Sequence, residues 1–131
     1  MGVLDMNEDF VSFSLAKKLK EKGFREEVNA YYGKWENLFD VHPALDMNDC
    51  DYRASAPTIS QILKWLREEK KIHVLIAPML KHSSATYHWG CEIYDISRMP
   101  ETVFYKESLF NMSSHNEAAL SGIKYVIDNL I

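Results

Sequence analysis

The strongest constraint on the fold is a change of hydrophobic period near residue 71. Residues 58–70 carry apolar side chains at helical spacing, and Thr58 and Gln61 have the spacing of a capping box. Residues 72–77 then alternate between two faces, and we expect Pro78 to end this strand. A helix and a strand that each present one apolar face predict a layered fold in which both faces are covered.

Further elements follow along the chain. Residues 87–95 alternate and predict a second strand with one buried face, and the β-rich residues 102–106 predict a short third strand. A last helix is expected to begin at Ser114, with Glu117 completing its capping box. From residue 58 the order is helix, three antiparallel strands, helix. The sequence thus predicts an α+β fold, specifically a two-layer sandwich over residues 58–131.

The first part of the chain is less regular. Residues 12–22 predict a helix that ends at Gly23, with its lysines on a solvated face. Residues 26–38 are compatible with either helix or strand. Residues 40–56 contain four aspartates and two turn-favouring clusters, so we expect an irregular acidic segment there. We interpret residues 1–131 as a single domain, with residues 1–56 preceding the helix-sheet-helix core.

Composition narrows the classes of partner. The chain has 131 residues, of which 47% are hydrophobic, enough for one core. Nineteen acidic against fifteen basic residues give a net charge of −4, which disfavours nucleic acid and anionic lipid as partners. There is no apolar run of membrane-spanning length and no signal-peptide pattern. Cys50 and Cys91 lie far apart and are expected to be reduced thiols, so we predict a cytoplasmic protein without membrane contact.

The order of elements in residues 58–131 resembles the double-stranded-RNA-binding domain. This resemblance of layout implies that Lys81 and His82, in the loop between the first two strands, would contact RNA. That family grips phosphates with lysines at the start of its final helix. Here the matching residues are Ser114 to Glu117, without a lysine, and Glu117 would repel phosphate. RNA binding is therefore kept as the alternative hypothesis.

Motifs for catalysis or metal binding are weak. His73, His82, His88 and Cys91 are the candidates for a metal site, but His88 and Cys91 are three residues apart and face opposite sides of a strand. The aspartates that begin at Asp46 lack the glycine and glutamate of a calcium loop. No nucleophile motif or phosphate-binding glycine loop is present. We predict no catalytic residue, metal or cofactor, and keep an enzyme as a second alternative.

Four aromatic residues flank the irregular acidic segment and form the candidate partner-binding surface: Tyr31, Tyr32, Trp35 and Tyr52. Aromatic side chains bury a large area at low entropic cost, which suits them to protein interfaces. The alternative is that these rings only cover an edge of the core.

Three segments carry a resemblance over nearly the whole chain. These are residues 10–19, the run ASAPTISQILKWL at residues 54–66, and residues 118–130. With them the chain resembles a group of small uncharacterised proteins of gut bacteria that are often found among mobile-element and phage-like genes. The resemblance implies an accessory protein of a mobile element, and no activity. We therefore expect a cytoplasmic interaction module that binds a protein partner, and a short edge strand that is compatible with a homodimer.

Overall fold

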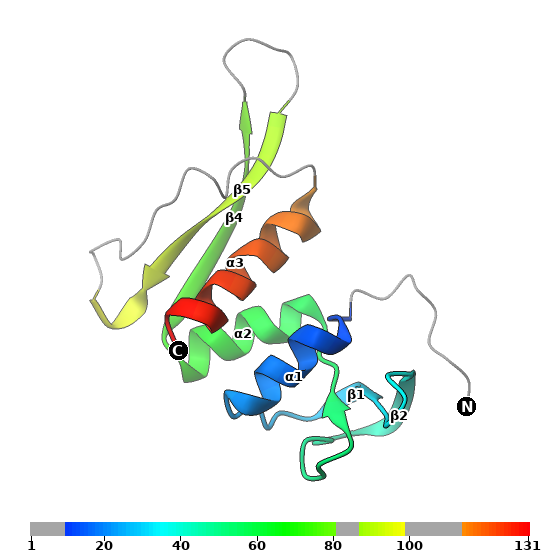
Figure 1. The fold of residues 1–131 in the computed structure, drawn as a ribbon. Coiled ribbons are helices and arrows are strands. Elements are labelled where there is room, and N and C mark those ends of the chain that lie inside the picture. Colours follow the sequence, from blue (N-terminus) through cyan, green and yellow to red (C-terminus); the bar gives the residue numbers. More distant parts are fainter. Residues whose placement is uncertain (1–9, 81–86, 99–113) are drawn as a thin grey trace. The chain divides into compact units, whose positions relative to one another are not determined.

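The computed structural model describes residues 10–80, 87–98 and 114–131. Within these ranges three α-helices and two antiparallel sheets form an α+β fold, which confirms the predicted fold class (Figure 1). The chain divides into two compact units, Met1–Gln61 and Ile62–Ile131, here called the N-terminal and C-terminal units. The single domain stays a prediction. None of the helices in the described ranges is long and apolar enough to cross a membrane.

Helix α1 (Phe13–Glu21) begins where Ser12 caps it. The Ser12 hydroxyl accepts a hydrogen bond from the backbone N–H of Leu15 at 3.3 Å. The helix stops before Gly23, whose φ of +88° is a left-handed conformation that glycine adopts without strain. Phe24 then turns back and is fully buried. The predicted first helix is confirmed, with each end one residue shorter than expected.

Three strands form the sheet of the N-terminal unit: β1 (Val28–Tyr32), β2 (Leu38–Leu45) and β3 (Ala54–Ser55). Their order is β2-β1-β3, and both pairs are antiparallel. The segment that the sequence left open is thus β1, a turn and the start of β2. The prediction of an irregular segment at residues 40–56 is wrong for residues 40–45 and 54–55, which lie in β2 and β3, and is confirmed for the loop of residues 46–53. Aspartates and Pro43 favour turns locally, but pairing with β1 overrides that preference.

The loop between β2 and β3 is held by hydrogen bonds from side chains to the backbone. The buried Asn48 donates through Nδ2 to the carbonyl of Phe24 at 2.7 Å, and its Oδ1 accepts from the N–H of Ser55 at 2.8 Å. The Ser55 hydroxyl accepts from the N–H of Met47 at 3.0 Å. Buried backbone groups need such partners. Asn48 therefore attaches this loop to the segment that follows α1.

Helix α2 (Ile59–Glu69) confirms the predicted capping box. Thr58 Oγ1 accepts from the N–H of Gln61 at 3.2 Å, and Gln61 Oε1 accepts from the N–H of Thr58 at 3.0 Å. Ile59, Ile62 and Leu66 of the predicted stripe are buried. The boundary between the two units falls within this helix, after Gln61.

The C-terminal unit contains the hairpin of β4 (Ile72–Leu80) and β5 (Tyr87–Asp95). The two strands pair in an unbroken antiparallel register from Ile72 opposite Asp95 to Leu80 opposite Tyr87. The second predicted strand is confirmed. Pro78 does not end the first strand, which continues to Leu80, and this expectation is corrected. Proline is tolerated in a strand with an open edge, and in the described ranges β4 pairs only with β5.

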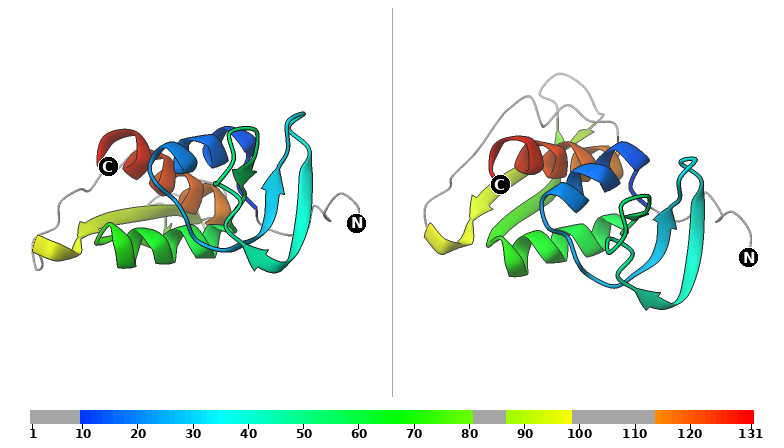
Figure 2. Two further views of the ribbon diagram at one scale, coloured as in Figure 1. Left: turned by 90° about the horizontal axis from the view of Figure 1, so that it is seen from below. Right: turned by 60° about the horizontal axis from the view of Figure 1, so that its bottom comes forward.

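Helix α3 (His115–Asn129) covers this hairpin, as two sets of views show (Figures 1 and 2). Ser114 caps it as predicted, because its hydroxyl accepts from the N–H of Glu117 at 3.1 Å. The helix lies close to the strands at Gly122, where an added Cβ would lie 2.7 Å from Val74 Cγ1 and 2.9 Å from Cys91 Sγ. The short turn η1 (Ile96–Arg98) follows β5. The predicted third strand at residues 102–106 lies outside the described residues.

Candidate interaction surface

Trp35 lies in the tight turn between β1 and β2. The N–H of Gly33 donates to the carbonyl of Asn37 at 3.0 Å, and the N–H of Glu36 donates to the carbonyl of Gly33 at 3.1 Å. Glu36 takes a left-handed φ of +64° to close the turn. Trp35 is 79% exposed, the highest value among the large hydrophobic residues that the structure describes. A hydrogen-bonded turn therefore presents a large ring to solvent.

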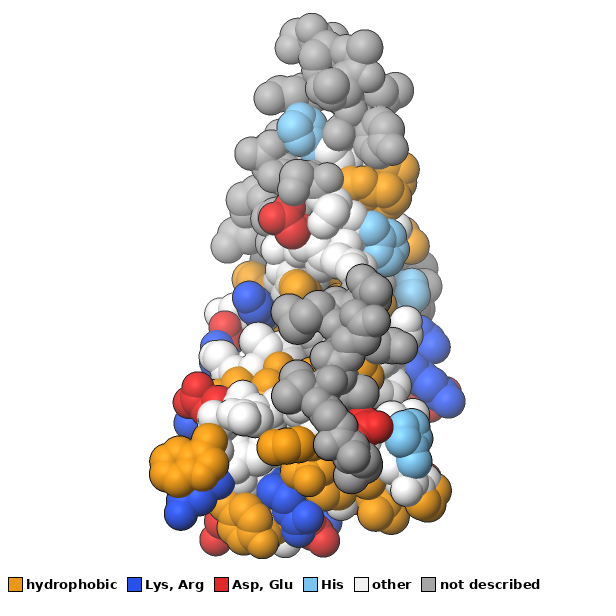
Figure 3. Space-filling model, turned by 90° about the vertical axis from the view of Figure 1, so that its right-hand side faces the viewer, with side chains coloured by type: hydrophobic (Ala, Val, Ile, Leu, Met, Phe, Trp, Pro, Cys, Tyr) orange, Lys and Arg blue, Asp and Glu red, His pale blue; other side chains and the backbone are white. Residues whose placement is uncertain are grey.

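Tyr52 lies in the loop before β3 and is 61% exposed. In the ladder between β1 and β3, Tyr32 is opposite Ala54, so the turn after β1 and the residues before β3 lie at the same end of the sheet. Lys34 and Tyr52 line one pocket. We call the four residues Lys34, Trp35, Tyr52 and Arg53 the Trp35–Tyr52 surface. Figure 3 shows exposed hydrophobic side chains beside lysines and arginines at the base of the view.

The other two predicted aromatic residues are half-buried and make internal contacts. The Tyr32 hydroxyl donates to the carbonyl of Val11 at 2.6 Å, and its ring packs edge-on against Phe13 at 5.5 Å. Burial raises the pKa of Tyr32. Tyr31 packs against Phe39 with ring centroids 5.7 Å apart. The structure thus exposes Trp35 and Tyr52 at the same end of the sheet and uses Tyr31 and Tyr32 in packing.

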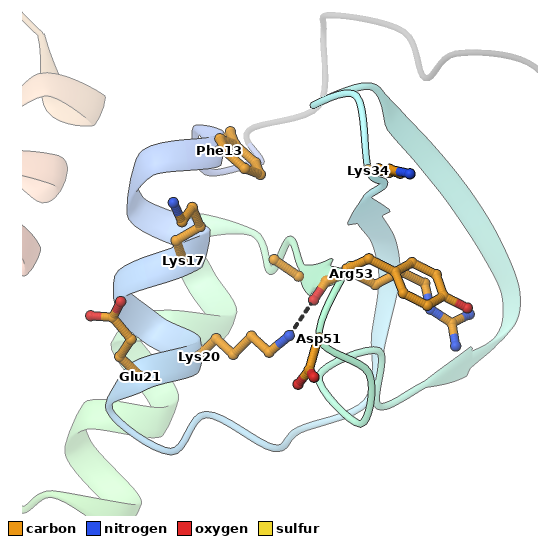
Figure 4. Close-up of a pocket in the computed structure, with 9 residues that line it drawn as sticks. Phe13, Lys17, Lys20, Glu21, Lys34, Asp51 and Arg53 are labelled. Carbon is orange, nitrogen blue, oxygen red and sulfur yellow. Dashed lines mark hydrogen bonds between the residues drawn. The ribbon is translucent and has the colours of Figure 1, made fainter.

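A pocket of about 400 Å³ lies beside this surface, between α1 and the loop before β3 (Figure 4). Phe13 and Tyr52 contribute rings to its lining. Its charged lining consists of Lys17, Lys20, Lys34, Arg53, Glu21 and Asp51. Four cations against two acids leave an excess of two positive charges, although the whole chain carries −4. The pocket is therefore locally cationic in an acidic protein.

Lys20 forms part of the pocket wall. Its Nζ donates to the carbonyls of Cys50 and Arg53, the latter at 2.6 Å, and Figure 4 shows the second bond. Two of the three N–H donors of the ammonium group are thereby used. The expectation that the lysines of this helix form only a solvated face is wrong for Lys20, because its side chain joins α1 to the loop before β3.

Three other cations of the N-terminal unit lie over aromatic rings. Lys17 Nζ is 5.4 Å from the centroid of Phe13, and Lys34 Nζ is 5.3 Å from that of Trp35. The guanidinium carbon of Arg53 is 5.5 Å from the Tyr52 centroid. Cation–π contacts of this kind are worth about 0.5–1 kcal/mol at exposed sites. They hold each charge beside a ring at the edge of the pocket.

Cys50 adjoins this pocket in the same loop. A hydrogen bond from the Tyr52 side chain lowers the pKa of its thiol, and Arg53 contributes in the same direction. The pKa of Tyr52 is raised, chiefly by its hydrogen bond with Cys50. By contrast, burial raises the pKa of Cys91 to about 11. Cys91 is therefore a protonated thiol at neutral pH and lacks the thiolate that a nucleophile needs.

The residues considered for a metal site are not brought together in the described ranges. His73 is opposite Tyr94 on the β4–β5 ladder, whereas His88 is opposite Met79. The six positions between His88 and Tyr94 span about 20 Å of strand. No three His, Cys, Asp or Glu side chains in the described part of the chain gather at one point.

The aspartates of the β2–β3 loop serve local structure. Asp46 Oδ1 accepts from the N–H of Asn48 at 2.9 Å, and its Oδ2 forms an ion pair with Arg25 Nε at 2.5 Å. Asp49 Oδ1 is 3.9 Å from Arg53 Nη2. The RNA-binding candidates Lys81 and His82 lie outside the described residues, and that alternative stays a prediction.

Sequence reasoning found Trp35 and Tyr52 but not the cationic pocket beside them. Lys17 and Lys34 are distant in sequence, so no local cluster of basic residues contains both. Only the pairing of β1 with β3 and the attachment of the loop to α1 bring their charges to one site. Comparison with known proteins finds no matching family model, no similar curated protein and no similar solved structure.

Proposed function

We propose that this protein is an interaction module that binds a protein partner through the Trp35–Tyr52 surface. The observation that carries the proposal is the 79% exposure of Trp35 on a hydrogen-bonded turn. The alternative was that these rings only cover an edge of the core. Trp35 and Tyr52 are 79% and 61% exposed, which argues against that alternative for both residues. Exposed tryptophan, tyrosine and arginine side chains are the residue types that dominate binding energy at protein interfaces.

The fixed backbone of the turn supports this role. An aromatic anchor has few rotatable bonds, so little side-chain entropy is lost when it is buried in a partner. Tyr52 and Arg53 provide a second ring and a cation at the same end of the sheet. The proposal places the protein in the cytoplasm, where the free thiols of Cys50 and Cys91 would persist.

A pull-down with matched variants tests the proposal. The tagged full-length chain is compared with the Trp35→Ala/Tyr52→Ala variant and with a Leu75→Ala/Leu130→Ala control, which removes exposed apolar side chains from the C-terminal unit. Captured protein is identified, purified and titrated against each variant by calorimetry. We expect the Trp35→Ala/Tyr52→Ala variant to lose at least about tenfold in affinity and the control to bind normally.

Two results would overturn the proposal. A purified partner that binds the Trp35→Ala/Tyr52→Ala variant as tightly as the unchanged chain would show that the surface is elsewhere. Captured material that disappears on nuclease treatment, with no protein remaining, would favour the RNA-binding alternative instead.

A further inference from the structure

The cationic pocket is continuous with the Trp35–Tyr52 surface, because Lys34, Tyr52 and Arg53 belong to both. A partner that covers the two exposed rings would therefore also approach the pocket. Its volume of about 400 Å³ is within the range of specific binding pockets. Whatever enters it must complement the excess of positive charge.

The cations differ in how they are engaged. Lys20 is committed to the carbonyls of Cys50 and Arg53 and stabilises the wall. Lys17 and Lys34 instead rest over ring faces at 5.4 and 5.3 Å, whereas Arg53, over the Tyr52 ring, also lies 3.9 Å from the Asp49 carboxylate. A cation over a ring keeps its hydrogen-bond donors on the side away from the ring, where an incoming carboxylate can accept from them.

We propose that this pocket binds an acidic segment of the protein partner, with Asp or Glu side chains that pair with Lys17 and Lys34. The inference rests on the proposed function and adds the chemistry of the partner. Figure 4 shows Lys17 and Lys20 on α1, with Arg53 and Asp51 on the facing loop. The Arg53 carbonyl faces Lys20, and the Arg53 guanidinium lies beside the Tyr52 ring, so an extended peptide meets Lys17 at α1 and Lys34 at the Trp35–Tyr52 surface.

The two acidic residues of the lining favour a peptide over a nucleic acid. A phosphate backbone offers only negative charge and acceptors along its length, so Glu21 and Asp51 would repel it. A peptide presents backbone N–H donors between its acidic side chains, and these can donate to Glu21 and Asp51. The mixed lining of four cations and two acids thus complements an acidic polypeptide.

Short synthetic peptides test the inference without an identified partner. Three peptides share the same apolar residues and carry Glu, Gln or Lys at the variable positions, and each is titrated into the ¹⁵N-labelled full-length chain. We expect the Glu peptide to shift amide signals of residues 13–21 and 51–54, and its affinity to fall severalfold between about 0.1 M and about 1 M salt. The Gln and Lys peptides should bind at least about tenfold more weakly.

Charge reversal provides the matched control. Lys17→Glu/Lys34→Glu should weaken Glu-peptide binding by about tenfold or more, whereas Lys64→Glu/Lys124→Glu changes the net charge equally and should leave binding within about twofold. All four lysines are exposed, so both variants are expected to fold. Equal loss in the two variants would show that only long-range charge matters and would overturn the inference.

Further outcomes separate this inference from the proposed function. No binding of the Glu peptide, together with partner capture that depends on Trp35, overturns the inference and leaves the proposed function intact. Glu-peptide binding that Lys17→Glu/Lys34→Glu abolishes, with a purified partner indifferent to Trp35→Ala/Tyr52→Ala, supports the pocket and overturns the proposed surface. Tighter binding of a uridine oligonucleotide, or equal binding of free glutamate, would assign the pocket to another class of ligand.

Discussion

The two units both bury an apolar core, but they differ in the regularity of their strands and in the side-chain hydrogen bonds that join their loops. In the C-terminal unit, β4 and β5 pair without a register break, and α3 lies on them with a continuous buried stripe. In the N-terminal unit, β1 has a register shift between Val28 and Ala30, and β3 has only two residues. Hydrogen bonds from polar side chains hold the loop between β2 and β3 in place. Lys20 joins this loop to α1, and Asn48 joins it to the segment that follows α1. The N-terminal unit thus adds individual side-chain hydrogen bonds to the apolar packing that both units share.

The largest expected effect tests the packing of the C-terminal unit. Ile123→Ala removes a fully buried side chain of α3 and should lower the free energy of unfolding by about 3–4 kcal/mol. Chemical denaturation measures the loss, and hydrogen exchange should accelerate more in residues 72–80 and 87–95 than in residues 28–45. The control Ile123→Val should cost about 1 kcal/mol. Equal acceleration in both segments would contradict the difference between the units.

The next effect tests the polar support of the N-terminal unit. Asn48→Ala leaves the carbonyl of Phe24 and the N–H of Ser55 without their side-chain partner and should cost about 2–3 kcal/mol. Asn129 is the control, because its Nδ2 donates to the Tyr125 carbonyl at 3.1 Å in an exposed setting. Asn129→Ala should change stability by about 0.5 kcal/mol or less. Similar losses for the two variants, measured by denaturation, would refute a special role for Asn48.

A third prediction concerns pH and the interior of the C-terminal unit. Burial raises the pKa of Cys91 to about 11, above that of an unfolded thiol, so folding favours the neutral form. The resulting stability is fully present below about pH 9 and is lost as the pH rises through about 11, by about 3 kcal/mol. Urea denaturation across this range should show a shallower decline in Cys91→Ala. Parallel curves for the two proteins would contradict the assignment.

The smallest expected effect concerns the hydrogen bonds by which Lys20 attaches the loop before β3 to α1. Lys20→Met keeps the aliphatic stem but removes the donors to Cys50 and Arg53, and should cost about 1 kcal/mol. Lys124→Met is the exposed control and should be neutral within about 0.5 kcal/mol. Iodoacetamide should also alkylate Cys50 faster in Lys20→Met, because the loop is released from α1. Unchanged stability and unchanged alkylation would show that Lys20 does not hold the wall.

Local signals predicted the helices well, because capping residues act within one turn of chain. Ser12, Thr58 and Ser114 each begin a helix where expected, and the alternation of residues 87–95 identified β5. The same local reasoning failed for β2, because its aspartates and Pro43 imitate a turn while its partner strand lies earlier in the chain. The sequence could suggest that Trp35 and Tyr52 are exposed. It could not place Lys17 and Arg53 on one pocket, since only the tertiary structure brings their segments to the same site.

Gly122 has a consequence for the evolution of this fold. An alanine there would place a methyl group within 3 Å of both Val74 and Cys91, so the helix would have to move outward or its neighbours would have to shrink. Related chains should therefore show correlated changes at positions 74, 91 and 122. A larger residue at one of these positions should be accompanied by smaller residues at the other two. A glycine on the strand-facing side of the last helix, matched to compact residues on two strands, is a pattern by which distant relatives could be recognised when overall similarity has been lost.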